Sequence, residues 1–128
     1  MPSSEETVSR KLHTIHMKGR EVFEFAVTIL PYATRKVLKS AKLKLKDITW
    51  LIPHQANNRI LENAVKRLGI PKEKVLSNVE WFGNTSSASI PMVLDEGVRS
   101  GKIKKGHLVV MVAFGAGLSW GACTVRWG

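Results

Sequence analysis

The chain has 128 residues, the usual size of a single domain. Its 44% hydrophobic and 23% charged residues argue against disorder, and no apolar run approaches the ~20 residues of a membrane span. Twenty Lys and Arg against ten Asp and Glu give a net charge of +10, which favours nucleic acid, an anionic membrane or an acidic protein as a partner. Because the one cysteine, Cys123, cannot form an internal disulfide, we expect a reducing compartment.

The amino-terminal part of the chain predicts one long helix. Residues 1–11 are polar and are expected to form an exposed lead-in, without the features of a signal or transit peptide. From Gly19 to about Ala41, apolar residues recur at helical spacing and predict an amphipathic helix. Pro31 lies inside this helix and predicts a kink near Val27, because proline removes a backbone hydrogen bond and clashes with the preceding turn.

The remaining residues alternate between strand and helix patterns. Strands are predicted at 48–52, 75–79, 108–114 and about 120–127. Helices are predicted at about 57–68, closed by Gly69, and after 85–89, whose small polar residues are expected to cap it, ending at Ser100. This order predicts an α/β fold with a largely parallel sheet and an antiparallel edge strand.

Three short segments follow predicted strands, where reactive groups of α/β sheets gather. His54 can donate or accept a proton or can cap the next helix, and the local pattern leaves both readings open. Asn84 can hold a carbonyl oxygen or adopt a left-handed turn. The glycines at 115 and 117 permit backbone N–H groups to approach an oxyanion, or form an ordinary hairpin turn.

Other chemistry finds less support in the sequence. The glycines separate two strands instead of opening a helix, so they are not a dinucleotide-binding fingerprint. His13 and His16 lack companions at zinc-like spacing. Cys123 is expected to be a small buried thiol and not a nucleophile. Arg59, Lys66 and Arg67 share one helical face, which suits a phosphate-bearing or acidic partner or is simply solvated.

Four motifs in register resemble 3-oxoacyl-[acyl-carrier-protein] synthase III, the condensing enzyme that starts type II fatty acid synthesis. They are MKGREVF at 17–23, WLIPHQAN at 50–57, GNTS at 83–86 and FGAGLSWG at 114–121. The resemblance implies a thiolase-like fold of two similar halves, with a mixed, mostly parallel sheet between helices. Residues 12–128 are similar to the carboxyl-terminal half, so the half that bears the nucleophilic cysteine is expected to be absent.

The resemblance also implies roles for particular residues. In the family, an acyl group passes from acyl-CoA to the cysteine, and malonyl-carrier-protein then loses CO2 and attacks the thioester. His54 and Asn84 match the pair that holds the malonyl thioester carbonyl, and the Ala116 backbone N–H matches part of an oxyanion hole. No metal or cofactor is expected, and the cytoplasm is implied, or a plastid in a photosynthetic eukaryote.

Further matches concern substrates and partners. Positions that line the pantetheine tunnel or acyl pocket correspond to Phe23, Ala56, Asn57 and Phe114. Arg59, Lys66 and Arg67 match the basic surface that docks the acyl carrier protein. The chain alone is expected to be inactive, to expose an apolar face, and to pair with the cysteine-bearing half or with itself, without a membrane or nucleic acid. Two alternatives remain: a small basic module that binds nucleic acid, and a non-catalytic remnant.

Overall fold

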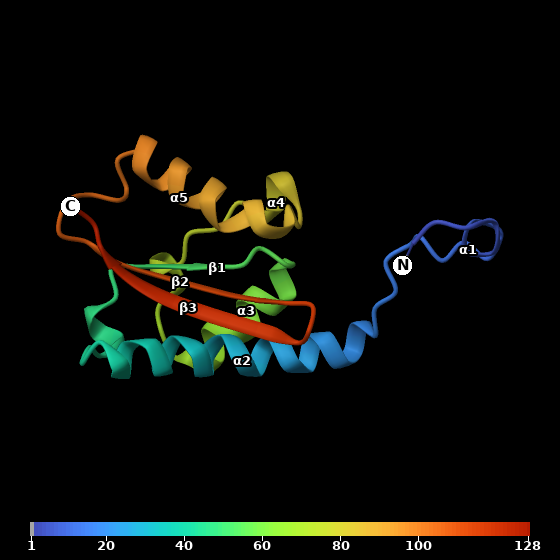
Figure 1. Ribbon diagram of the computed structural model, residues 1–128. Coiled ribbons are helices and arrows are strands. Elements are labelled where there is room, and N and C mark those ends of the chain that lie inside the picture. Colours follow the sequence, from blue (N-terminus) through green and yellow to red (C-terminus); the bar gives the residue numbers. More distant parts are fainter. Residues whose placement is uncertain (1) are drawn as a thin grey trace.

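The protein is described by a computed structural model of residues 2–128; Met1, part of the predicted lead-in, lies outside the described residues. A three-stranded sheet has the order β1-β2-β3, with α2 and α3 on one face and α4 and α5 on the other (Figure 1). The helices are α1 (Glu5–Ser9), α2 (Gly19–Ser40), α3 (Asn58–Leu68), α4 (Val79–Phe82) and α5 (Ser89–Arg99), and the strands are β1 (Trp50–Pro53), β2 (Leu108–Gly115) and β3 (Ser119–Arg126). Short 3-10 turns occupy Leu45–Asp47, Lys72–Lys74 and Ser86–Ala88.

The central strand β2 is apolar throughout because helices cover both of its faces. Val110 and Val112 face α2 and α3, in a core with Leu30 and Ile60. Val109 faces the opposite way, in a second core with Val93 of α5. β1 pairs with β2 in parallel, and β3 pairs with β2 antiparallel, as the sequence predicts. This buried parallel pair brings the carboxyl ends of β1 and β2 to one edge of the sheet.

The long helix α2 matches its predicted range, but it continues through Pro31. Figure 1 shows one rod with no abrupt bend near Val27, so the predicted kink is not observed. Leu30 and Ala33 are buried on either side of the proline, and the Thr34 hydroxyl donates to the Leu30 carbonyl at 2.8 Å. Packing against the sheet and α3 therefore holds the helix where proline removes one hydrogen bond.

Two predicted elements need correction. Residues 75–79 do not form a strand: Val75 makes one parallel bridge to Leu51, and the chain then turns into α4 at Val79. The short apolar run cannot distinguish a strand from a buried turn and helix. α1 is also unpredicted; Ser4 caps it, it buries no residue, and in Figure 1 it lies away from the sheet.

β3 is the exposed edge of the sheet. Within residues 2–128 it pairs only with β2, and α2 covers one of its faces. Cys123 lies on this strand and is exposed, so the predicted burial of its thiol is wrong. Its register partner Met111 packs with the α5 core, so Cys123 points to that side, where α5 covers β1 rather than β3. No helix among the described residues has the length and apolar character to cross a membrane.

Candidate functional site

His54 stands directly beyond the carboxyl end of β1. Its backbone N–H donates to the Val112 carbonyl at 2.8 Å, which continues the parallel pairing by one residue past the strand. This bond fixes where the imidazole leaves the sheet. The ring is half-buried and packs edge-on against Phe114 of β2, with ring centroids 5.4 Å apart.

The imidazole is anchored on one side. Its Nδ1 lies 2.7 Å from the Oγ of Ser89, the first residue of α5. Burial lowers the pKa of His54 below its ordinary value of 6.5. The side chain is therefore neutral at pH 7, and its Nε2 is left to face the open space beyond the sheet.

This burial predicts a pH dependence. We expect the His54 resonances to titrate with a midpoint below 6.5, and His54→Gln identifies them by their disappearance. Because the unfolded chain binds the proton more tightly, the free energy of unfolding falls as the pH drops through 6.5 towards the folded-state pKa. Comparison of pH 5 with pH 7 should show a smaller loss in His54→Gln than in the wild-type chain. A midpoint above 6.5 in the NMR titration would contradict this prediction.

Asn84 forms a local turn through its side chain, the left-handed backbone lies at its neighbours Gly83 and Ser86, and its role in holding a carbonyl oxygen stays a prediction. Gly83 before it has φ +65°, a conformation that favours glycine. The Asn84 Oδ1 accepts a hydrogen bond from the Ser86 backbone N–H at 3.1 Å, which makes a local turn. Because oxygen is the atom that must meet this N–H, the amide orientation is fixed, and Nδ2 is left without a hydrogen-bond partner among residues 2–128.

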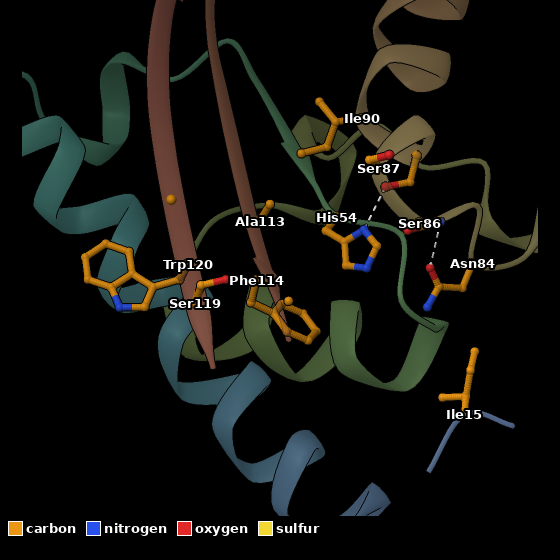
Figure 2. Close-up of a pocket in the computed structure, with 13 residues that line it drawn as sticks. Ile15, His54, Asn84, Ser86, Ser87, Ile90, Ala113, Phe114, Ser119 and Trp120 are labelled. Atoms are coloured by element: carbon orange, nitrogen blue, oxygen red, sulfur yellow. Dashed lines mark hydrogen bonds between the residues drawn. The ribbon is translucent and has the colours of Figure 1, made fainter. Parts of the chain in front are cut away.

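His54 and Asn84 line the same hollow, of about 730 Å³. Figure 2 shows the His54 and Phe114 rings and the Asn84 amide around it, with the hydrogen bonds to His54 and Asn84 as dashed lines. The other lining residues come from the segment between α1 and α2, the segment before and at the start of α5, and the β2–β3 hairpin: Ile15, Ser86, Ser87, Ser89, Ile90, Ala113, Gly115, Ser119, Trp120 and Gly121. Two neutral polar side chains thus face one largely apolar space.

Gln55 and Ser89 support this site and were missed by the sequence analysis. Gln55 is completely buried; its Nε2 donates to the Pro53 carbonyl, and its Oε1 accepts from the Ser77 hydroxyl at 2.7 Å and the Asn78 N–H at 3.2 Å. Its backbone N–H donates to Ser89 Oγ at 3.3 Å. The available signal was a polar Gln two residues after an apolar strand. The predicted side-chain cap of α5 is also wrong, since its N-cap is Ala88 and makes no side-chain hydrogen bond.

The glycine turn lies beside the hollow. Ala116 is in the three-residue connection between β2 and β3, and its carbonyl accepts from the Ser119 hydroxyl at 3.0 Å. Gly115 and Ser119 line the hollow, whereas Ala116 is exposed and does not. The oxyanion role of the Ala116 N–H therefore stays a prediction.

The predicted substrate-binding residues divide between two places. Phe114 lies with His54, as described above. Phe23 and Asn57 line a second hollow of about 530 Å³, together with Arg59. The Asn57 side chain also caps α3 by accepting from the Ile60 N–H at 2.9 Å. Ala56 is half-buried and packs against the core on the α2 side of the sheet.

The three basic residues of α3 are exposed, and two of them reach towards α2. The Arg59 guanidinium lies 5.8 Å from the centre of the Phe23 ring, and Arg67 donates to the Thr28 hydroxyl at 3.2 Å. None of Arg59, Lys66 and Arg67 forms a salt bridge within residues 2–128. Their charge is therefore available to an acidic partner. The same part of the chain holds no cluster of three His, Cys, Asp or Glu side chains suited to a metal.

Comparison with known proteins gives a consistent family. The sequence model of the family described as 3-oxoacyl-[acyl-carrier-protein (ACP)] synthase III C terminal matches residues 38–127. The chain is 54% identical over 128 residues to a beta-ketoacyl-[acyl-carrier-protein] synthase III of Symbiobacterium thermophilum. The match covers 100% of this chain and 39% of that protein. It is 52% identical over 126 residues to a Synechocystis protein of the same name, covering 98% of this chain and 38% of the relative.

Solved structures agree with the sequence matches. The fold is similar to beta-ketoacyl-[acyl carrier protein] synthase III from Thermus thermophilus, with a TM-score of 0.86 and 50% identity over 88% of this chain and 35% of that one. It is also similar to the synthase III from Pseudomonas aeruginosa, with a TM-score of 0.89 and 40% identity over 98% of this chain and 40% of that one. These likenesses confirm the predicted α/β fold class. The chain spans about two fifths of the length of the curated relatives it matches.

Proposed function

Because the chain belongs to the family of 3-oxoacyl-[acyl-carrier-protein] synthase III carboxyl-terminal domains and has a thiolase-like fold, we propose that it supplies the decarboxylating part of a condensing site. The proposed domain is residues 12–128, and the proposed reaction joins acyl-CoA and malonyl-carrier-protein to initiate fatty acid synthesis. The observation that supports it most strongly is that two neutral polar side chains, His54 and Asn84, line one hollow.

The chemistry of decarboxylation suits this pair. When the malonyl thioester loses CO2, the electrons of the broken carbon–carbon bond move into the thioester carbonyl and give an enolate. Donors placed at that oxygen, in a space with few competing waters, lower the barrier by several kcal/mol, of the order of 3 per donor. A neutral His54 can stabilise the enolate oxygen by a hydrogen bond, and the imidazole does not first have to take up a proton from solvent. The enolate carbon then attacks the acyl thioester carbon, the C–S bond to the cysteine of the other half breaks, and the cysteine leaves as thiolate. The proposal uses no metal or cofactor.

The nucleophile is proposed to come from outside this chain. Cys123 lies on β3, exposed, and is not among the residues that line the hollow with His54. We therefore expect that the isolated chain does not condense acetyl-CoA with malonyl-carrier-protein. A burst of acylation at Cys123 followed by turnover would overturn this part of the proposal.

A full-length chimera tests the proposed function. Residues 12–128 replace the matching region of the Thermus thermophilus synthase, with which this chain shares 50% identity. We expect the chimera to condense acyl-CoA with malonyl-carrier-protein and the isolated chain not to do so. A chimera that folds and accepts an acyl group, yet forms no 3-oxoacyl product, would contradict the proposal and favour a non-catalytic remnant.

The basic residues of α3 are proposed to dock the acidic carrier protein. Reversing their charge in the isolated chain should weaken carrier-protein binding about 10-fold or more at low salt, as for other steered, charge-complementary contacts. The three changes are Arg59→Glu, Lys66→Glu and Arg67→Glu. Titration by fluorescence anisotropy measures the dissociation constant.

A matched control distinguishes docking from non-specific attraction. Three lysines after α2 are exposed, and their reversal changes the net charge equally: Lys42→Glu, Lys44→Glu and Lys46→Glu. We expect this control to retain most of the affinity. Equal losses in both triple variants would contradict a local docking surface. Steep salt-dependent binding of RNA or DNA without carrier-protein binding would favour the nucleic-acid alternative.

The surface around β3 is proposed to pair with the cysteine-bearing half or, in the isolated chain, with a second copy. The strand has one free edge within the described residues, and beside it Tyr32, Trp120 and Leu118 are 51%, 39% and 55% exposed. Long, unprotected edge strands favour pairing with another chain. Sedimentation should show a dimer, and Cys123 should react more slowly with a thiol reagent as concentration rises. A monomer with unchanged Cys123 reactivity at all concentrations would contradict self-pairing.

A further inference from the structure

Among residues 2–128, Ser89 is the one side chain that forms a hydrogen bond with His54 Nδ1. It is 1% exposed and is the first residue of α5. Its Oγ lies 2.7 Å from His54 Nδ1 and 3.3 Å from the Gln55 backbone nitrogen. The sheet positions His54 and Gln55 and the helix positions Ser89, so the three groups meet where two elements join.

The hydrogens at this junction can be assigned by counting donors and acceptors. The Gln55 N–H can only donate, so it uses a lone pair of the Ser89 oxygen. If His54 Nδ1 also carried a hydrogen, both nitrogens would donate to that oxygen. The Ser89 hydroxyl hydrogen would then have no acceptor among residues 2–128, in a buried place where an unmade hydrogen bond is costly. The alternative satisfies every group: the hydroxyl donates to an unprotonated Nδ1.

We infer that Ser89 donates its hydroxyl hydrogen to His54 Nδ1 and thereby holds the neutral imidazole in the tautomer with hydrogen on Nε2. Nε2 is the nitrogen that faces the hollow, so this tautomer presents a donor there and its counterpart would present a lone pair. Ser89 is thus a positioning residue for His54. That role rests on the proposed function, whereas the tautomer does not.

The same short segment orients the second donor. The Ser86 backbone N–H donates to the Asn84 Oδ1, so that, within residues 2–128, Nδ2 has no hydrogen-bond partner. Residues 84–89 therefore set the hydrogen-bonding direction of both groups that face the hollow. A lone pair from His54 would repel a developing enolate oxygen, so the tautomer decides whether the pair can act together.

Nitrogen NMR of the uniformly labelled isolated chain tests the assignment without any reaction. Above pH 6.5, His54 should show a protonated Nε2 and an unprotonated Nδ1, with His54→Gln identifying the signals. Ser89→Ala removes the hydroxyl and should change the ratio of the two tautomers about fivefold towards Nδ1–H, the equivalent of about 1 kcal/mol. Ser87→Ala is the matched control, because Ser87 lines the same hollow and, within residues 2–128, forms no hydrogen bond to His54.

Two results would overturn the inference. One is a wild-type spectrum with hydrogen on Nδ1, which decides the question even if Ser89→Ala fails to fold. The other is a folded Ser89→Ala chain whose tautomer ratio equals that of the wild type. The readout also separates the two proposals, since an inactive chimera with the expected tautomer refutes only the function, and an active one with hydrogen on Nδ1 refutes only the role of Ser89.

Discussion

Asn84→Asp in the chimera is expected to lower the rate of condensation about 100-fold to 1000-fold. The substitution keeps the shape of the side chain, and a carboxylate oxygen can still accept the Ser86 N–H that forms the turn. The other end changes from an N–H donor to a negative oxygen, next to the place where the enolate charge develops. Loss of one such donor alone has an effect of this size.

The kinetic constants distinguish this effect from a binding defect. We expect kcat to fall, because the donor acts on charge that exists only in the transition state, while acyl transfer from acyl-CoA stays intact. Lys105→Ala, at an exposed position outside the hollow, should stay within about twofold of the unsubstituted chimera. A folded Asn84→Asp chimera that condenses at a nearly unchanged rate would remove Asn84 from the proposed chemistry.

Gln55→Ala is expected to lower the free energy of unfolding of the chain by about 3 kcal/mol or more. The Gln55 side chain is completely buried and joins the Pro53 carbonyl, the Ser77 hydroxyl and the Asn78 N–H. Truncation leaves these groups without their partner, at about 1–3 kcal/mol for each buried one, and leaves a cavity as well. Urea denaturation measures the change.

Asn63→Ala provides the comparison for Gln55. Asn63 is an exposed amide on α3 that, in the described part of the chain, donates only to the Arg59 carbonyl one turn earlier. Its loss should change the stability by less than about 0.5 kcal/mol. If Gln55→Ala destabilised the chain no more than Asn63→Ala, the hydrogen bonds of Gln55 would not be what holds the segment around His54 to α4 and α5.

The elements with long, regular patterns could be predicted from the sequence. α2 and α3 were found from helical spacing, and the αL glycine that ends α3, Gly69, has φ +77°. The nearly continuous apolar run predicts β2, and this strand is apolar because helices cover both of its faces. The strand prediction at 75–79 is wrong, because a five-residue apolar run cannot show whether the residues are buried in a strand or in a turn that packs under another element.

The residues that line the site could be predicted from the sequence, but the hydrogen bonds that orient them could not. His54 follows β1, Phe114 lies near the end of β2 and Asn84 follows α4, and all three line one hollow. The bond from Ser89 to His54 joins residues 35 apart in the sequence, and no local pattern encodes it. Cys123 was misplaced for a related reason: its burial depends on which face of β3 a helix covers, and this is set by the packing of α5.

The rate of CO2 release from malonyl-carrier-protein by the chimera is the most direct test of the proposed role of this chain. The measurement compares the unsubstituted chimera with the double variant His54→Ala and Asn84→Ala, after acyl transfer to each protein has been shown to be equal. The account predicts that CO2 release falls at least about 100-fold in the double variant. Release at the same rate in both proteins would contradict the claim that these two donors stabilise the enolate.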